Sequence, residues 1–238
     1  MLTGTLSAEC RARLTQECDR HPWAVDGTLP LVRRLADLVI DTARLRLRPV
    51  AVADAPALFA IFSDPVVMRY WSTPPWTAPA QAEEMVRRES AGAAGGSSVR
   101  LAVLLQAGGG AVPDGRPVPG PVPGPAPRPA PRPGELIGTV SLFALDLGNR
   151  RAEIGYALHR SVWGHGYAAE AVTGVVDHAF CELGLNRLEA DIDPRNEASA
   201  RLLERLGFRR EGLLRERWIV AGVVSDSALY GLLRSDRA

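Results

Sequence analysis

The chain has 238 residues, of which 46% are hydrophobic and 23% are charged, and its formal net charge is +1. A chain of this length and composition can bury a globular core without a disulfide or a metal to hold it together. The balance of 28 basic against 27 acidic residues argues against nonspecific nucleic-acid binding, which depends on clustered cations. Every basic residue is arginine, which excludes a lysine nucleophile, a Schiff-base lysine and a phosphate-binding lysine.

The sequence contains no apolar run near the ~18 residues that a membrane helix needs, and its N-terminus lacks the pattern of a signal peptide. Its cysteines, Cys10, Cys18 and Cys181, are odd in number and fit no disulfide framework, as expected in a reducing compartment. With His21, Cys10 and Cys18 lack a fourth zinc ligand, so no metal is expected. We therefore expect a cytoplasmic protein without membrane, nucleic-acid or metal partners, and the sequence leaves a homodimer open.

The chain is predicted to form one domain over residues 41–238, preceded by a helical extension over residues 1–40. Alternating leucine and arginine over residues 42–50 predict a half-buried strand. Helices are expected after Asp54, which is a good N-cap, and after Thr77, where a proline falls in the first turn.

A proline- and glycine-rich segment interrupts the domain at residues 108–134. Ten of the nineteen prolines lie between Pro113 and Pro133, a composition that favours extended polyproline II over a packed element. The flanking runs Val99–Leu105 and Leu136–Leu145 are both strand-like, so the segment is interpreted as an insertion in a hairpin. A tolerated surface loop is the favoured interpretation, and a docking segment for a proline-binding partner is the alternative.

A strand, a glycine-rich turn and a long amphipathic helix follow one another in the most informative part of the chain. The strand is expected at Arg151–Leu158 and the turn at Trp163–Ala168, and the helix continues to a stop at Gly184. The start of such a helix presents unpaired N–H groups and the positive end of its dipole, which together bind anions. Gly164 and Gly166 would let the backbone approach a diphosphate closely, although tight strand–helix turns also use glycine for steric reasons alone.

A second strand–helix unit follows, with its strand expected at Arg187–Ile192. Asn196 is a good N-cap for the helix, and Ser199 occupies its third position. Capping alone accounts for both residues, without any chemistry. The domain is expected to end in two further strands, Leu213–Val220 and Ser227–Leu233.

The order of these elements and their motifs resemble the GNAT superfamily of acetyl-coenzyme A-dependent N-acetyltransferases, in particular its RimJ/RimL-type branch. The resemblance covers residues 42–234 and is carried by four segments: Asn149–Tyr156, Trp163–Ala171, Asp193–Ser199 and Leu206–Glu216. It implies an α/β fold built on a mixed, mostly antiparallel central sheet. That sheet is expected to splay between its fourth and fifth strands, with helices on both faces and coenzyme A in the splay.

The resemblance also implies which residues bind acetyl-coenzyme A, the co-substrate. The diphosphate is expected on the backbone of the turn, whose residues are Trp163, Gly164, His165, Gly166, Tyr167 and Ala168. Trp163 departs from the glutamine or arginine of the wider superfamily and removes one side-chain contact. The thioester carbonyl is expected against the backbone of Tyr156, Ala157 and Leu158, and the pantetheine arm against Asn196.

Two side chains are predicted to act in the transfer. Ser199 matches a hydroxyl that lies near the thioester sulfur in related enzymes, and it is expected to protonate the leaving thiolate. Glu153 alternates with Ile154 and Tyr156 on a central strand, so its carboxylate must face a cleft or a partner, and it is the preferred base for the amine. An ion pair with a nearby arginine is the equal alternative for Glu153, and Glu216 is a weaker candidate base.

The predicted activity is transfer of an acetyl group from acetyl-coenzyme A to a primary amine, of a protein N-terminus or of a small molecule, by direct transfer. Tyr70, Trp71 and Trp76 fall in the region that covers the acceptor in this family, although packing between two helices explains them equally well. The alternative function is a non-catalytic acyl-coenzyme A-binding module. The presence of both Glu153 and Ser199 argues against that alternative.

Overall fold

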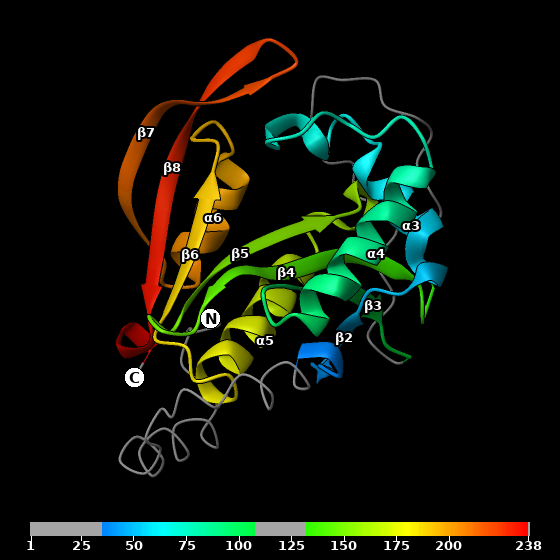
Figure 1. Cartoon of the computed structure of the whole chain (residues 1–238), viewed down its shortest axis with the longest axis horizontal. Coiled ribbons are helices and arrows are strands. Elements are labelled where there is room, and N and C mark those ends of the chain that lie inside the picture. The colour runs from blue at the N-terminus through cyan, green and yellow to red at the C-terminus, as the bar shows by residue number, and fades with distance from the viewer. Residues whose placement is uncertain (1–34, 108–131, 238) are drawn as a thin grey trace.

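The computed structural model describes residues 35–107 and 132–237, and every structural statement below concerns these residues. Their strands form one eight-stranded sheet in the order β1-β2-β3-β4-β5-β6-β8-β7 (Figure 1). Neighbouring strands are antiparallel except β5 and β6, which are parallel. The strands are β1 (Ile40–Asp41), β2 (Leu45–Pro49), β3 (Val99–Leu105), β4 (Leu136–Asp146), β5 (Arg151–Leu158), β6 (Arg187–Ile192), β7 (Arg209–Val220) and β8 (Val223–Leu233).

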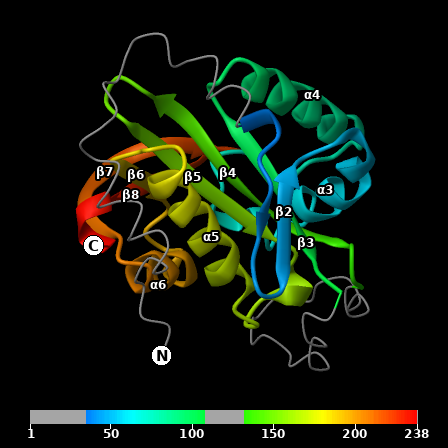
Figure 2. The ribbon, with the colours of Figure 1, turned by 90° about the horizontal axis from the view of Figure 1, so that it is seen from below.

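The two faces of the sheet carry separate hydrophobic cores. Helices α5 (Tyr167–Cys181) and α6 (Glu197–Arg205) pack on one face, and α3 (Ala55–Phe62) and α4 (Ala80–Ala94) pack on the other (Figure 2). Because successive side chains of a strand point to opposite faces, β3 contributes Leu101 to the α5 side and Ala102 to the α4 side. The predicted class, a mixed and mostly antiparallel sheet with helices on both faces, is confirmed.

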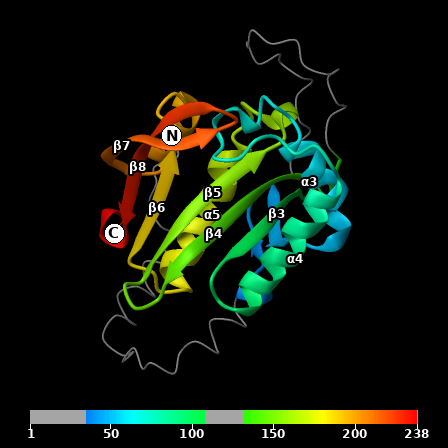
Figure 3. The ribbon, with the colours of Figure 1, turned by 45° about the horizontal axis from the view of Figure 1, so that its top comes forward.

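The sheet opens between β5 and β6 because these strands pair over only three residues each. Arg151–Glu153 of β5 lie opposite Arg187–Glu189 of β6, and beyond this point the two strands diverge (Figures 1 and 3). The predicted splay is therefore present between the two predicted strands. The splay was expected between the fourth and fifth strands and lies between β5 and β6. The strand numbers differ by one because β1 is a short edge strand that the sequence pattern did not separate from β2.

Most predicted elements have close to their expected bounds, and the differences have local causes. β3, β5 and β6 begin and end where the sequence predicts, whereas β7 and β8 begin earlier than predicted, because they form one long hairpin. Asp54 is the N-cap residue of α3, as predicted, but its side chain makes no capping hydrogen bond to the helix. Its carboxylate instead accepts the Ala51 N–H (2.8 Å) and pairs with Arg48 (2.7 Å), because a short 3-10 turn separates β2 from the helix.

The described part of the predicted N-terminal extension already belongs to the core. Leu35 and Leu38 are buried on the α5 side of the sheet. The rest of the extension, which includes Cys10, Cys18 and His21, lies outside the described residues. Within the described residues, no helix combines the length and the apolar character of a membrane span. Cys181 is disulfide-bonded, which departs from the expectation that the cysteines form no disulfide.

Removing the proline-rich segment is expected to leave the fold intact. Residues 108–131 lie outside the described residues, but both ends of the segment meet at neighbouring strands: the Gly134 N–H donates to the Leu105 carbonyl (2.8 Å), and the Leu105 N–H donates to the Glu135 carbonyl (3.2 Å). Because closure entropy changes slowly with loop length, replacing residues 110–132 by a short turn should leave the melting temperature within a few degrees of wild type. Thermal denaturation of both proteins checks this, and aggregation of the shortened chain would contradict it.

Candidate active site

A cavity of about 540 Å³ opens where β5 and β6 diverge. Such a cleft at a break in a sheet, lined by a few converging polar groups, is the usual form of a small-molecule site. Its walls come from β5, β6, the start of α6, the β7–β8 hairpin and the segment ahead of α4. The polar and aromatic side chains that line it include Tyr70, Trp71, Glu89, Arg100, Ser141, Glu153, Tyr156, Asp191, Asp193, Asn196, Ser199, Arg217 and Trp218.

The turn before α5 has the backbone conformation that the sequence analysis required. Gly164 and Gly166 have φ values of +81° and +79°, a region that favours glycine, and Gly166 is the N-cap of α5. The first N–H groups of α5 have no partner within the helix, so they remain available to an anion at the positive end of its dipole. The His165 Nδ1 atom is buried without a hydrogen-bond partner among the described residues, which marks the turn as incompletely satisfied.

The side chains of this turn face inward and leave the backbone for the ligand. The Trp163 indole N–H donates to the Leu158 carbonyl (2.8 Å), which ties the turn to the end of β5. The Tyr167 side chain is buried in the core. Any diphosphate contact from these two residues must therefore come from their backbone.

The open edge of β5 also presents free backbone donors. The His159 N–H donates to the Ile137 carbonyl on the β4 side (2.8 Å). Because N–H groups alternate along a strand, those of Tyr156 and Leu158 point the other way, toward the splay. β6 does not pair with this part of β5, so both N–H groups can donate to a bound carbonyl.

An ion-pair cluster fixes the turn against the edge of the sheet. The Glu170 carboxylate, in the first turn of α5, accepts the Thr42 hydroxyl (2.6 Å), the Arg44 N–H (2.7 Å) and the Arg44 Nε (2.6 Å). Arg44 also donates to the His165 carbonyl (3.0 Å), and its guanidinium lies 4.4 Å from the centre of the Tyr167 ring. Burial alone would raise the pKa of Glu170, but the hydrogen bonds from Thr42 and Arg44 outweigh it and lower that pKa.

Ser199 forms a close contact across the splay. Its Oγ lies 2.6 Å from the phenolic oxygen of Tyr156, so this hydrogen bond joins the first turn of α6 to β5. The Ser199 N–H donates to the Asn196 Oδ1 (3.2 Å), which confirms Asn196 as the N-cap. Burial raises the pKa of Tyr156 to about 12, against the opposing effect of its bond to Ser199.

Glu153 lines the cavity without a close cationic partner. Burial raises its pKa, and the neighbouring carboxylates of Glu189 and Asp191 raise it further, while Arg217 and Arg151 act in the opposite direction. No ion pair within 4 Å joins Glu153 to a described residue, so the predicted alternative of a structural ion pair is not found. A half-buried carboxylate with a raised pKa in a cleft is typical of a general base.

The other carboxylates that line the cavity each have an arginine. Glu89 pairs with Arg100 (3.3 Å), Asp191 pairs with Arg217 (3.0 Å), and Asp193 accepts hydrogen bonds from its near neighbour Arg195 (2.9 Å). Among the described lining residues, Glu153 is therefore the one carboxylate without an arginine partner.

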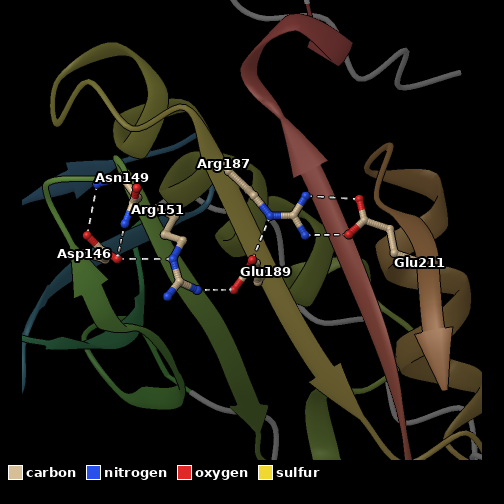
Figure 4. A network of polar contacts seen from close by, with 6 residues as sticks. All are labelled: Asp146, Asn149, Arg151, Arg187, Glu189 and Glu211. Carbon is tan, nitrogen blue, oxygen red and sulfur yellow. Dashed lines mark hydrogen bonds and ion pairs between the residues drawn. The ribbon is translucent and has the colours of Figure 1, made fainter. Parts of the chain in front are cut away.

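Charged side chains join the strands at the closed end of the splay (Figure 4). Arg151 of β5 contacts Asp146 of β4 (3.4 Å) and Glu189 of β6 (3.0 Å). Arg187 of β6 contacts Glu189 (2.7 Å) and Glu211 of β7 (3.1 Å). The chain of contacts runs from β4 to β7 and reinforces the three-residue pairing from which the cavity opens.

A glycine allows the last contact of this network to cross an intervening strand. Gly231 of β8 lies between β6 and β7, opposite both Glu189 and Arg209. A Cβ at Gly231 would collide with the Glu211 carboxylate, so the side chain of Glu211 occupies the space that glycine leaves.

The sequence matches the family described as "Acetyltransferase (GNAT) domain" over residues 44–209. The chain belongs to the GNAT family of N-acetyltransferases. The acetyltransferase is 34% identical over 197 residues to the uncharacterised N-acetyltransferase p20 of Bacillus licheniformis, a match that covers 83% of this chain and 97% of the relative.

Two further matches concern relatives whose names specify an acceptor. The Escherichia coli protein named ribosomal protein uS5-alanine N-acetyltransferase is 29% identical over 103 residues, which are 43% of this chain and 53% of that one. The crystal structure of spermidine N-acetyltransferase from Vibrio cholerae, in complex with CoA and spermine, matches with a TM-score of 0.65. That match covers 82% of this chain and 99% of the other at 21% identity, and it therefore concerns the fold.

The candidate acceptor residues of the acetyltransferase fall into two groups. Tyr70 and Trp71 line the cavity, and their role in binding the acceptor stays a prediction. Trp76 is not among the lining residues; its ring is partly buried against the α3–α4 core, 4.8 Å from that of Phe62, which Trp71 also contacts (5.4 Å). Glu216, the weaker candidate base, is exposed in an irregular part of β7 and does not line the cavity.

The sequence analysis missed two features of the acetyltransferase. The pair of Arg44 and Glu170 was not selected. A glutamate in the first turn of a helix that follows a glycine-rich turn is visible in the sequence, but its partner lies 126 residues away. The side chain of Tyr156 was not selected either, since only its backbone was expected at the site.

Glu170→Gln is expected to destabilise the acetyltransferase at neutral pH. Because the folded-state pKa of Glu170 is lowered, its stabilising effect is present at neutral pH and is lost as the pH falls below about 4.5 and through the folded-state pKa. Melting temperatures measured from pH 7 to pH 3 should therefore show a deficit that is constant down to about pH 5 and narrows below about pH 4.5. The control is Glu197→Gln, which removes an exposed partner of Arg201 and should have little effect. An equal deficit at every pH would contradict the assignment.

Proposed function

We propose that this acetyltransferase moves the acetyl group of acetyl-coenzyme A to a primary amine, of a protein N-terminus or of a small molecule, by direct transfer in a ternary complex. The observation that carries the proposal is the cavity at the splay, where an unpaired carboxylate and a hydrogen-bonded hydroxyl pair share one space. The two sides of the cavity suit the two reactants. The carboxylate suits the amine, and the hydroxyl and amide donors suit the thioester.

The residues available to acetyl-coenzyme A fit its chemistry. The amides of the turn at residues 163–168 suit the diphosphate, and the free N–H groups of Tyr156 and Leu158 suit the thioester carbonyl. Asn196 lines the cavity and suits the amide-bearing pantetheine arm. The fold-level neighbour from Vibrio cholerae was solved with CoA, which is consistent with this use of the fold.

Each catalytic group then has a defined task. Glu153 takes the proton that the attacking amine must lose, directly or through water, and its raised pKa brings it closer to the working pH of a base. The N–H groups of β5 stabilise negative charge that develops on the carbonyl oxygen. Ser199 compensates the negative charge on the departing sulfur.

The charges of the cavity favour an acceptor with a single amine at its reacting end. Glu153 can attract one ammonium group before that group loses its proton. A polyamine brings a second ammonium, for which the described cavity offers no second unpaired carboxylate. This supports a peptide N-terminus or a simple monoamine over a polyamine as the acceptor.

Gly166→Ala is expected to weaken acetyl-coenzyme A binding at least tenfold, or about 1.4 kcal/mol, because the added methyl group both strains the backbone and holds phosphate away from it. The matched control is Gly222→Ala in the β7–β8 turn, which has a similar φ of +82° and open space around the added Cβ. Calorimetric titration measures both affinities. Equal affinities in two folded variants would remove the diphosphate from this turn.

Separate losses are expected when the two catalytic groups are removed. Ser199→Ala should lower kcat with little change in acetyl-coenzyme A affinity, and Glu153→Gln should lower kcat/KM and remove the acid limb of its pH profile. For Glu153 the loss should be ~10²–10⁴-fold, the usual contribution of a general base. Because the folded-state pKa of Glu153 is raised, its charge opposes folding at neutral pH, so Glu153→Gln should not lower the melting temperature. Normal turnover in both variants would reject these roles.

The acceptor class is tested by thiol release from acetyl-coenzyme A with a panel of amines. The panel contains a peptide that begins with alanine, a simple alkyl monoamine and spermidine, and mass spectrometry locates the acetyl group. We expect the first two to be acetylated faster than spermidine. Faster acetylation of spermidine would contradict the charge argument, and tight binding of acetyl-coenzyme A with no turnover on any amine would indicate the non-catalytic alternative.

A further inference from the structure

We propose that Tyr156 is a positioning residue that holds the Ser199 hydroxyl as a hydrogen-bond donor toward the sulfur of coenzyme A. The inference rests on the proposed acetyl transfer and adds to it a residue whose side chain had no assigned role.

The geometry places the Tyr156 hydroxyl on Ser199 rather than on the acceptor side of the cavity. The two side-chain oxygens lie 2.6 Å apart, whereas the Ser199 carbonyl lies 3.5 Å from the Tyr156 oxygen. Ser199 is almost fully buried, so few other groups compete for its hydroxyl. Both residues line the cavity, which leaves one side of the serine oxygen open to a ligand there.

The direction of this hydrogen bond decides what Ser199 can do. If Tyr156 donates, the serine oxygen accepts and its own hydrogen is free to point into the cavity. If Ser199 donates instead, its hydrogen is used and only lone pairs face a sulfur that is becoming negative. A phenol is a stronger hydrogen-bond donor than an aliphatic hydroxyl, which favours the first arrangement, and Tyr156, with a pKa of about 12, keeps its hydrogen across the working pH range.

The pair acts by hydrogen bonding and keeps both of its protons. In the transfer a nitrogen–carbon bond forms, the carbon–sulfur bond breaks, and the electron pair of that bond goes to sulfur. A phenol with a pKa of about 12 is a weaker acid than a thiol, whose pKa is ~8.5, so neither hydroxyl gives its proton to the thiolate. The amine proton leaves through Glu153 to water, and water protonates the thiolate. The earlier expectation that Ser199 protonates the thiolate is thereby refined to hydrogen-bond donation.

Two hydroxyls in series make a better donor than one. A hydroxyl that accepts a hydrogen bond becomes a stronger donor, and hydrogen bonds to charged acceptors are stronger than those to neutral ones. Tyr156 also fixes the rotamer of Ser199, because β5 and α6 hold the two side chains from opposite walls.

The test is the pKa of the thiol of bound coenzyme A, followed by the ultraviolet absorbance of the thiolate, with no acceptor present. A donor at the sulfur stabilises the thiolate, so the wild-type protein should bind coenzyme A with a thiol pKa below that of free coenzyme A. Tyr156→Phe should raise the bound-thiol pKa by about one unit, a tenfold change in the thiolate-to-thiol ratio. Ser199→Ala should raise it at least as much, and adding Tyr156→Phe to Ser199→Ala should change nothing further.

The matched control is Tyr230→Phe, which removes a buried tyrosine hydroxyl whose partner is Glu204 and which does not line the cavity. Its bound-thiol pKa should equal that of wild type. A second readout is turnover: Tyr156→Phe should lower kcat without changing the KM for acetyl-coenzyme A, and the loss should shrink with a thioester whose thiol is more acidic.

Three results would overturn the inference: an unchanged bound-thiol pKa in Tyr156→Phe, a lowered one, or an effect of Tyr156→Phe that persists when Ser199 is already alanine. A lowered value would mean that Ser199 donates to Tyr156. The proposed function fails separately, because it fails if the wild-type protein does not bind coenzyme A or does not acetylate any amine.

Discussion

The three-residue parallel pairing of β5 with β6 is the constraint on which the rest of the site depends. A continuous ladder would satisfy the N–H groups of Tyr156 and Leu158 with β6 carbonyls and would close the cavity. Ending the ladder after Glu153 leaves these donors free and lets α6 carry Ser199 up to β5. Unpaired backbone groups are costly in a protein interior, so a break in a central sheet persists where a ligand can take the place of the missing strand.

The break is stable because its two ends are held differently. At the closed end, Arg151, Glu189 and Arg187 link the strands, and Gly231 gives Glu211 the space to join them across β8. At the open end, the Tyr156–Ser199 hydrogen bond is a direct polar contact between the two walls. The turn before α5 is held from a third direction by Arg44 and Glu170. The unpaired carboxylate of Glu153 therefore lies in a site whose neighbouring charged side chains form ion pairs.

Patterns that are local in the sequence predicted the scaffold of this site well. Period-2 alternation located β5 and β6, and the glycine spacing located a turn whose φ values require glycine. Asn196 and Ser199 could be placed in the first turn of a helix because capping signals extend over only a few residues.

Contacts between distant segments were beyond the reach of the sequence. Arg44 and Glu170 are 126 residues apart and Tyr156 and Ser199 are 43 apart, and no periodicity in a single chain marks such pairs. Trp71 and Trp76 illustrate the same limit, because both rings pack against Phe62 and only Trp71 also lines the cavity. The resemblance to a family predicts the residues of the site, whereas their hydrogen-bond partners are visible only in the fold.

The most direct measurement of the central claim is amide hydrogen exchange, residue by residue, with and without coenzyme A. If the splay is the coenzyme site, saturating ligand should slow exchange at the amides of residues 163–168 and at Tyr156 and Leu158, whose N–H groups face the gap. The amides of Ala157 and His159, which face β4, should change little. Protection that appears elsewhere on the domain, or no protection at the open edge of β5 when coenzyme A is bound, would contradict the account.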